Sequence, residues 1–478
     1  MKKFVLFLFC SFIISCNQSV SHQTVDFSFD DVNSFFIINK GNDDKKIMTK
    51  WYDLFSSELA FKAISNDYSN NQEFQLYKQL TDPFMFDKSL HNLESRNVVL
   101  SEDISEISFN INDKKTIYDA YDLDKLYDIV MKYEGKYCYL WVDSAFKDEQ
   151  DFSNEELTSF AEKFDKIYEK QIALCGNRYV GNSIYEDIIL PCKKISIVLI
   201  DISKENIGGY FWGTDFIDNQ YSGHFEAIYI DSIYAKDKKN YPICFSTLTH
   251  EFAHMLTFVN KEVTKGLSFD VWYTEMISML VEDFLKEDLE VSFIHSPQGR
   301  LSSFIKGDYN YGFKNENNWE SSELALKSYA NAYAFGAFLV RNYGGAKLLK
   351  EICSNNFTNE ESVVEAVNKI NNLNLTFEDL LKEFCYILIN PDNLDSLLPS
   401  LNKTCSDMIG DFTFNLEAID LDDLPIKDKE FDSSIFYSSL SFVPNSYLGS
   451  YGFNYVKLEK PTSIKIDNNS SDLIFHYK

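Results

Sequence analysis

The sequence has few of the residues that cross-link small extracellular domains or break up secondary structure. Its 478 residues include only nine cysteines, nine prolines and 18 glycines. Seven of the cysteines lie after position 16, an odd number without Cys-x-x-Cys pairs, which favours neither a disulfide framework nor a cysteine metal site. A chain of this length builds a core without such cross-links, so buried free thiols are expected.

Positive charge is also scarce. The chain carries 45 lysines and arginines against 73 aspartates and glutamates, a formal net charge of -28. A protein with this charge repels phosphate backbones and anionic lipid surfaces, so nucleic acid is not an expected partner. Hydrophobic residues at 45 % and aromatic residues at 16 % nevertheless predict a folded chain rather than a disordered one.

No long apolar run occurs after residue 15, so no membrane-spanning helix is expected. Residues 1–15 have lysines at positions 2 and 3 and continue as a short apolar stretch, the pattern of a signal peptide. Cys16 follows Ile13-Ile14-Ser15, which resembles a bacterial lipobox and predicts acylation of Cys16 after cleavage. The expected location is the bacterial cell envelope outside the cytoplasm, with residues 16–26 as a polar tether; a plain secreted protein is the alternative.

Histidine is rare as well, with seven residues, yet two of them flank a glutamate in His250-Glu251-Phe252-Ala253-His254. On a helix, residues four apart share a face, so His250 and His254 can bind one metal ion. Glu251 is rotated by about 100° and can face a water molecule at that metal. This spacing predicts a zinc-hydrolase core, with an ordinary amphipathic helix as the alternative.

Apolar residues at helical intervals around this motif predict a buried helix over residues 246–260, capped by Ser246 or Thr247. Tetrahedral zinc needs a third protein ligand. Thr257 and Asn260 stand where a third-histidine motif would require glycine and histidine, so that solution fails. The better candidate is Glu275, on a second helical stretch that begins at about residue 271.

Asp270 is a rival for the third ligand, although the Trp-x-x-Glu context favours Glu275. The segment continues as Glu275-Met276-Ile277-Ser278-Met279 and is followed by the acidic pair Glu282-Asp283. A third block, rich in aromatic residues and glycine, runs from Tyr329 to Gly345. Together these three blocks resemble the hyicolysin family of zinc metallopeptidases, of the gluzincin type, over about residues 100 to 360.

The resemblance implies one catalytic Zn²⁺ held by His250, His254 and Glu275, with Glu251 as the general base that takes a proton from the attacking water. A second donor to the oxyanion is usual in such sites. Tyr333 and Tyr329 are the candidates because both lie in the third block, with His224 in reserve.

The chain departs from the family pattern at Met279, where many gluzincins have an acidic residue that orients the first histidine. Ser278 or Glu282 are possible replacements. The implied function is hydrolysis of peptide bonds in protein or peptide substrates by an endopeptidase.

Two other functions stay open. One is a lipid-anchored binding protein or adhesin that keeps zinc for stability; Glu251 argues against it, since a structural zinc needs no general base. The other is a hydrolase of a different substrate, such as a free amino terminus or a cell-wall peptide.

The expected fold class is α+β. Residues 137–142, 195–200 and 225–230 predict buried strands and residues 154–174 an amphipathic helix. Strands followed by two zinc helices are typical of gluzincin-like catalytic domains, with a mixed sheet, a helical active-site lobe and an edge strand that pairs with substrate. Glu226 would lie on that strand, either as a solvent-facing carboxylate or as a group that binds a substrate amine.

The domain boundaries follow from these segments. Residues 101–406 form the expected metallopeptidase domain. Residues 27–100 are a module of uncertain fold, with a prodomain as one interpretation. Alternating, turn-rich segments after residue 407 predict a small all-β module over 407–478.

Overall fold

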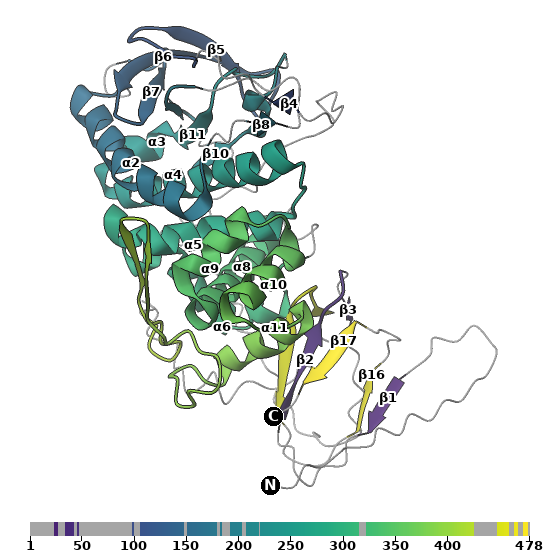
Figure 1. The fold of residues 1–478 in the computed structure, drawn as a ribbon. Coiled ribbons are helices and arrows are strands. Elements are labelled where there is room, and N and C mark those ends of the chain that lie inside the picture. The colour runs from purple at the N-terminus through teal and green to yellow at the C-terminus, as the bar shows by residue number, and fades with distance from the viewer. Residues whose placement is uncertain are drawn as a thin grey trace, which may run out of the picture.

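The protein is described by a computed structural model of mixed α/β class. The described residues are 23–26, 34–42, 45–46, 98–99, 106–147, 151–178, 182–183, 192–202, 207–218, 220–314, 322–424, 447–457, 463–466 and 472–476. Figure 1 shows a sheet with its covering helices at one end, a helical body below it, and strands from both chain ends beside the helical body. The catalytic segment predicted from sequence lies where the sheet-bearing part meets the helical body.

The main sheet has six described strands in the order β10-β11-β9-β7-β6-β5. Its centre is parallel, because β9 pairs in parallel with both β7 and β11, while β10, β6 and β5 are antiparallel to their neighbours. Parallel strands need cover on both faces, which explains their nearly continuous apolar sequences. Their bounds are β5 Lys114–Tyr118, β6 Leu126–Glu134, β7 Cys138–Asp143, β9 Ile195–Ile200, β10 Gly209–Phe211 and β11 Ala227–Asp231.

Alternate residues of these strands enter two separate cores. Leu140 and Ile197 face the helices α2 (Asn154–Cys175) and α4 (Tyr241–Thr257), whereas Trp141 and Val198 face a second aromatic cluster on the opposite side of the sheet. The predicted strands and the predicted helix over 154–174 are therefore confirmed. Ser153 and Glu156 begin α2 with a capping box that sequence reasoning did not identify.

The helix carrying the His-Glu-x-x-His motif begins earlier than predicted. α4 starts at Tyr241, where Pro242 in the first turn presets the backbone for a helix, so neither Ser246 nor Thr247 is its cap. Nearly all of α4 is buried, and it continues as a π-helix over Phe258–Val263. A helix that is covered on all sides holds its side chains in fixed positions.

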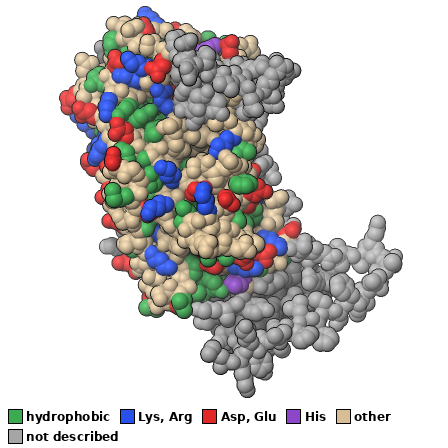
Figure 2. Space-filling model, viewed as in Figure 1, with side chains coloured by type: hydrophobic (Ala, Val, Ile, Leu, Met, Phe, Trp, Pro, Cys, Tyr) green, Lys and Arg blue, Asp and Glu red, His purple; other side chains and the backbone are tan. Residues whose placement is uncertain are grey.

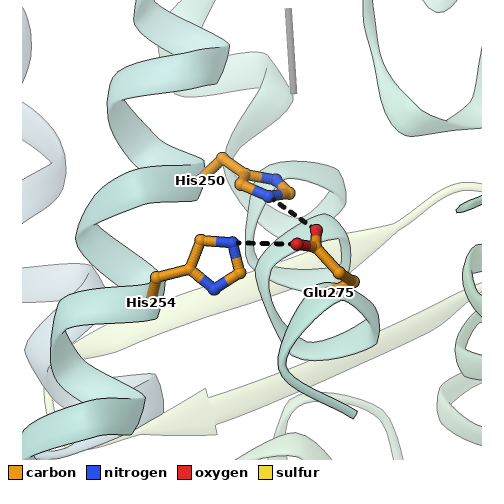
Figure 3. A group of neighbouring side chains, drawn as sticks. All are labelled: His250, His254 and Glu275. Carbon is orange, nitrogen blue, oxygen red and sulfur yellow. Dashed lines mark hydrogen bonds and ion pairs between the residues drawn. The ribbon is translucent and has the colours of Figure 1, made fainter. Parts of the chain in front are cut away.

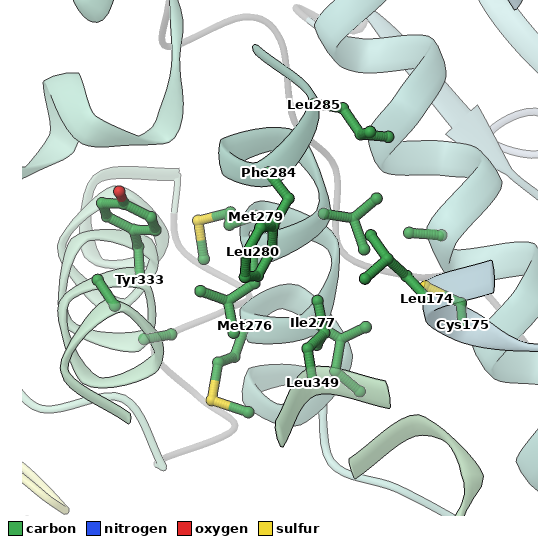
Figure 4. Packing of buried hydrophobic residues seen from close by; sticks show 14 of the residues in the cluster. Leu174, Cys175, Met276, Ile277, Met279, Leu280, Phe284, Leu285, Tyr333 and Leu349 are labelled. Carbon is green, nitrogen blue, oxygen red and sulfur yellow. The ribbon is translucent and has the colours of Figure 1, made fainter. Parts of the chain in front are cut away.

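The helix that carries Glu275, α5 (Val271–Leu289), runs through the middle of the molecule and matches the predicted helical stretch. Figure 4 shows its apolar side chains packed between Tyr333 of α8 on one side and Leu174 and Cys175 of α2 on the other, with Leu349 of α9 nearby. The remaining described helices of the body are α6 Leu301–Ile305, α8 Ser322–Tyr343, α9 Gly345–Ser354, α10 Asn359–Asn371 and α11 Phe377–Phe384; the short α3, Ser232–Lys236, precedes α4.

The packing of α8 on α5 explains why the third sequence block has a glycine at position 336. Gly336 lies where α8 crosses α5, and a Cβ atom built on it would stand 2.7 Å from Cγ of Met276 and 3.1 Å from Leu280. The missing side chain therefore lets the two helices pack closely. Through this contact α8 supports the helix that carries Glu275.

Strands from the two ends of the chain share sheets. β2 (Ser34–Asn39) lies between β15 (Phe453–Lys457) and β17 (Leu473–His476), antiparallel to both. β1 (Gln23–Asp26) pairs with β16 (Ser463–Ile466), and β3 (Lys45–Lys46) with β14 (Tyr447–Leu448). Strands from the predicted N-terminal module (β2 and β3) and from the predicted tether (β1) thus share sheets with strands of the predicted C-terminal module, so residues 23–26 are a paired strand rather than part of a tether. Two further pairs are β4 (Val98–Val99) with β8 (Asn182–Ser183) and the hairpin β12 (Cys405–Ile409) with β13 (Phe412–Leu416).

The predicted boundary after residue 406 falls inside β12, whose hairpin packs on the helical body. Much of the remaining module prediction, including residues 47–97 and 425–446, lies outside the described residues. So do the signal segment and Cys16.

A glycine-rich turn joins the terminal sheet to the helical body. Gly449 donates its N–H to the carbonyl of Asn310 (2.8 Å), and Phe313 donates to the carbonyl of Ser450 (3.0 Å). A Cβ atom on Gly449 would lie 1.6 Å from the Tyr311 oxygen, so only glycine permits this approach. The terminal sheet is therefore docked next to the loop that precedes α8.

Acidic and basic side chains are interspersed on the face seen in Figure 2, with small hydrophobic patches between them. Among the helices of the described residues, none is both long and apolar enough to cross a membrane. The seven described cysteines are free thiols, six of them buried.

Candidate active site

The metal-ligand candidates come together at the contact between α4 and α5. His250 and His254 project from successive turns of α4 toward Glu275 of α5, as Figure 3 shows. Nε2 of His250 is 3.0 Å from Oε2 of Glu275, and Nε2 of His254 is 3.4 Å from Oε1. Among the described residues, these three form the one group of such side chains whose ligand atoms all lie within 4.8 Å of one another. All three are fully buried.

The electrostatics of this group favour a cation. Burial opposes a charge on Glu275, but the imidazoles of His254 and His250 outweigh it and lower its pKa to about 2. Burial also opposes a charge on His250, yet the carboxylates of Glu275 and Glu282 raise its pKa to about 10. The carboxylates thus stabilise positive charge at the imidazoles. They would stabilise a divalent cation bound there in the same way.

Whether a metal ion fits this group depends on the contacts that each imidazole makes at Nδ1, the ring nitrogen that does not face Glu275. Nδ1 of His250 lies 2.7 Å from Oε1 of Glu282, and Nδ1 of His254 lies 2.8 Å from Oγ1 of Thr274 and 3.2 Å from Oγ of Ser278. A ring whose Nδ1 is engaged in this way presents Nε2 as its metal donor. Two imidazole nitrogens and one carboxylate match the donor set of a catalytic zinc site. The residues therefore fit the ion.

Glu251 lies on α4 between the two histidines and is 1 % exposed. It follows His250 directly on the helix that carries both histidines, and its role as general base stays a prediction. A carboxylate in such a dry site has few competing hydrogen bonds from bulk water, which suits a general base.

The rival ligand Asp270 lies elsewhere. Its carboxylate accepts hydrogen bonds from Nζ of Lys314 (2.5 Å) and from Nε1 of Trp272 (3.2 Å) immediately before α5. Asp270 therefore holds Lys314 and Trp272 next to the start of α5, and Glu275 is the carboxylate that faces Nε2 of both histidines.

The two tyrosines proposed as oxyanion donors lie on α8. The hydroxyl of Tyr333 donates to Oδ2 of Asp283 (2.9 Å), a carboxylate that also pairs with Arg341 (3.1 Å). The ring of Tyr329 lies 4.5 Å below the guanidinium of Arg300. Tyr333 thus has a structural partner within the core, and a role for either tyrosine in catalysis stays a prediction.

His224 is not part of the metal-ligand group. It is 46 % exposed and lies 3.9 Å from Asp218. Its neighbour Phe225 packs on Trp141, on the face of the sheet opposite to α4. This location separates the His224 loop from the α4 face.

The prediction for Glu226 was wrong in its position and exposure. Glu226 is 1 % exposed and directly precedes β11, which lies inside the sheet rather than at its edge. Its carboxylate pairs with Arg178 and accepts the N–H of Cys192 (3.1 Å). Burying a carboxylate requires such a partner, and Arg178 lies 48 residues away in the sequence, so no local pattern revealed it.

Neighbouring elements hold α4 in place. Gln171 of α2 donates to the carbonyl of Thr249 (2.9 Å), next to His250. On the other side, a Cβ on Gly209 of β10 would stand 2.8 Å from Thr247, so the edge strand β10 runs close to α4. The metal-ligand group therefore rests on a helix fixed by both the sheet and α2.

Sequence reasoning missed Thr274 and Ser246 as polar partners in this site. The hydroxyl of Ser246 donates to Oε2 of Glu282, the same carboxylate that contacts His250. A signal existed, because Thr274, Ser278 and Glu282 recur every four residues and so lie along one face of α5.

A family model described as Peptidase M30 matches residues 125–390, more than half of the chain. The match spans α2, α4, α5 and the block around Gly336, so it includes every member of the metal-ligand group. A search of curated proteins finds no significant match. The M30 family is the hyicolysin family, which the three sequence blocks resemble. Membership of this family implies a metallopeptidase. The chain therefore belongs to the peptidase M30 family.

Proposed function

We propose that this protein is a zinc-dependent endopeptidase that acts outside the cytoplasm. The observation that carries the proposal is the buried group of His250, His254 and Glu275, whose ligand atoms lie within 4.8 Å of one another, with Glu251 buried one residue after His250 on the same helix. Membership of a metallopeptidase family supports the reaction class. The donor set of two imidazoles and one carboxylate supports zinc as the metal.

His250, His254 and Glu275 would hold the ion. When bound, zinc supplies a positive charge that polarises the substrate carbonyl and lowers the pKa of water. Glu251 takes the proton from the attacking water and passes it to the departing amine. Thr274 and Glu282 keep the imidazoles oriented throughout, so the site needs little rearrangement as charge develops.

Substrate binding is proposed at β10. Within the described residues β10 is the edge strand next to α4, and an extended peptide pairs naturally with such an edge. A peptide laid along β10 would pass close to the helix that carries Glu251. This geometry suits a cut inside a chain.

The contacts of Glu226 favour an endopeptidase over an aminopeptidase. An aminopeptidase needs a carboxylate that binds the substrate's free amine, and Glu226 was the candidate for that role. Its charge is instead paired with Arg178 inside the fold. The binding-protein alternative is disfavoured by Glu251, since a zinc site that only stabilises the fold needs no base.

Anchoring through a lipid on Cys16 belongs to the same proposal. It is supported by the signal-like residues 1–15 and by the lipobox-like Ile13-Ile14-Ser15-Cys16. Mass spectrometry of the protein purified from membranes tests it: a diacylated or triacylated Cys16 at the amino terminus is expected. An unmodified chain that begins elsewhere would refute the anchor.

The central experiment compares casein cleavage by the full-length wild type and by Glu251→Gln, with zinc content measured in both. Loss of the base is expected to slow cleavage by about 10²- to 10⁴-fold without loss of zinc. Glu155→Gln, the same change at an exposed site on α2, is the matched control and should cut normally.

The peptides produced separate the remaining functions. Internal fragments support an endopeptidase, and stepwise loss of amino-terminal residues would identify an aminopeptidase. Zinc binding without any cleavage by the wild type would refute the enzymatic proposal and leave the binding protein. Equal cleavage by wild type and Glu251→Gln would refute the assignment of the base.

A further inference from the structure

Two rows of polar side chains face each other across the contact between the zinc helices. Each row has a spacing of four residues, which places its members on one face of its helix. The helices run antiparallel, because the early residues of one row meet the late residues of the other. The rows are Ser246, His250 and His254 on α4, and Thr274, Ser278 and Glu282 on α5.

The α5 row contacts the two histidines with different chemical groups. The contact to His250 is a carboxylate, since Oε1 of Glu282 lies 2.7 Å from Nδ1 of His250. Nδ1 of His254 lies instead 2.8 Å from the hydroxyl of Thr274 and 3.2 Å from that of Ser278. When the hydrogen-bond acceptor at Nδ1 is charged, Nε2 of the imidazole is a stronger metal ligand than when that acceptor is neutral.

Glu282 is itself held in place at both oxygens. While Oε1 contacts His250, Oε2 accepts the hydroxyl of Ser246, one helical turn earlier on α4. The residue is 7 % exposed, so solvent competes little with these bonds. Ser246, Glu282 and His250 thus form a closed chain of contacts between the two helices.

The neighbouring acid shows that this arrangement is specific to Glu282. Asp283 is also buried but accepts hydrogen bonds from Tyr333 and Gln298 and pairs with Arg341. Its partners hold α5 to α8 and to the segment after α5. Of this acidic pair, Glu282 therefore contacts His250, whereas Asp283 makes its contacts within the core.

We propose that Glu282, fixed by Ser246, is the positioning residue of the metal site and makes His250 the stronger of the two imidazole ligands. This inference rests on the zinc site of the proposed function. It explains how the chain dispenses with an acidic residue at Met279: the carboxylate is supplied one turn further along α5, in contact with the same histidine.

The test measures zinc affinity, by competition with a chromophoric chelator, for the full-length wild type and four variants. Glu282→Ala is expected to weaken zinc binding by about 10- to 100-fold. Glu282→Gln keeps an acceptor oxygen but loses the charge, so a smaller loss is expected, and it serves if the alanine variant fails to fold. Ser246→Ala should weaken binding in the same direction by less than Glu282→Ala.

Asp283→Asn is the matched control, a buried carboxylate lost from the adjacent position, and its zinc affinity should equal that of the wild type. Wild-type affinity in both Glu282 variants would overturn the proposal and leave Glu282 as a purely structural link between helices. An equal loss in Asp283→Asn would also overturn it, because the effect would then follow from core disruption. Absence of zinc binding by the wild type would instead refute the zinc site itself.

Discussion

Asp215 should make the stability of this protein depend on pH in a way that one substitution removes. Asp215 is fully buried after β10, where its carboxylate accepts hydrogen bonds from the hydroxyl of Tyr229 and the N–H of Gly223, both at 2.6 Å. Burial raises its pKa from 3.8 to about 7, since these two bonds offset only part of the desolvation. Three pKa units correspond to about 4 kcal/mol.

The sign follows from the raised pKa. As pH rises from about 4 to about 7, the unfolded chain ionises at this residue while the folded chain still holds the proton, so folding loses stability. In Asp215→Asn the amide keeps an acceptor for Gly223 and cannot ionise. The variant should therefore gain up to about 4 kcal/mol relative to wild type over this range and then remain constant.

Urea unfolding of both proteins between about pH 4 and about pH 8, with chelator present throughout, measures this difference. Taking the difference cancels every other titrating group that the two proteins share. Asp218→Asn, at an exposed position in the loop that follows, controls for the loss of a carboxyl group. A difference for Asp215→Asn that is flat with pH, or that falls as pH rises, would refute the reasoning.

Three further outcomes are expected. Gly336→Ala should destabilise the protein by about 1–3 kcal/mol in urea unfolding, because its Cβ would stand 2.7 Å from Met276; no change would mean that α8 can shift freely. Arg341→Met should cost about 3–5 kcal/mol by leaving Asp283 buried without its cation, and a loss below about 1 kcal/mol would contradict this. Zinc at a hundredfold excess over its Kd should raise stability by about 2.7 kcal/mol, reversibly with chelator. The same zinc should leave His254→Ala unchanged, and stabilisation of that variant would place the ion elsewhere.

The local part of the site could be predicted from sequence because helix geometry fixes it. Two histidines four residues apart must share a face of α4, and Glu251 must point to one side of them. Glu275 required more, since its distance to the histidines depends on how α5 packs. The need for a third ligand and the second helical stretch pointed to it, and the resemblance to the hyicolysin family supported it. The structure brings it to 3.0 Å from His250.

Predictions that depended on distant partners failed. Glu226 was expected at a solvent-facing edge because strand alternation alone cannot show that Arg178 covers it. The start of α4 was placed five residues late, because buried residues on every side of the helix obscure the amphipathic pattern that marks an end. The shared terminal sheet left no signal either, since strand pairing between residues more than 400 apart has no local signature.

The terminal sheet can form only after its last strands have been synthesised. Its middle strand, β2, is synthesised near the beginning, whereas its two neighbours, β15 and β17, emerge at residues 453–476. During synthesis the edges of β2 stay unpaired until β15 and β17 emerge, while the helices of the body can already pack. A chain interrupted before residue 453 would display those edges, and with them a mark by which quality-control proteases could distinguish it from the finished protein.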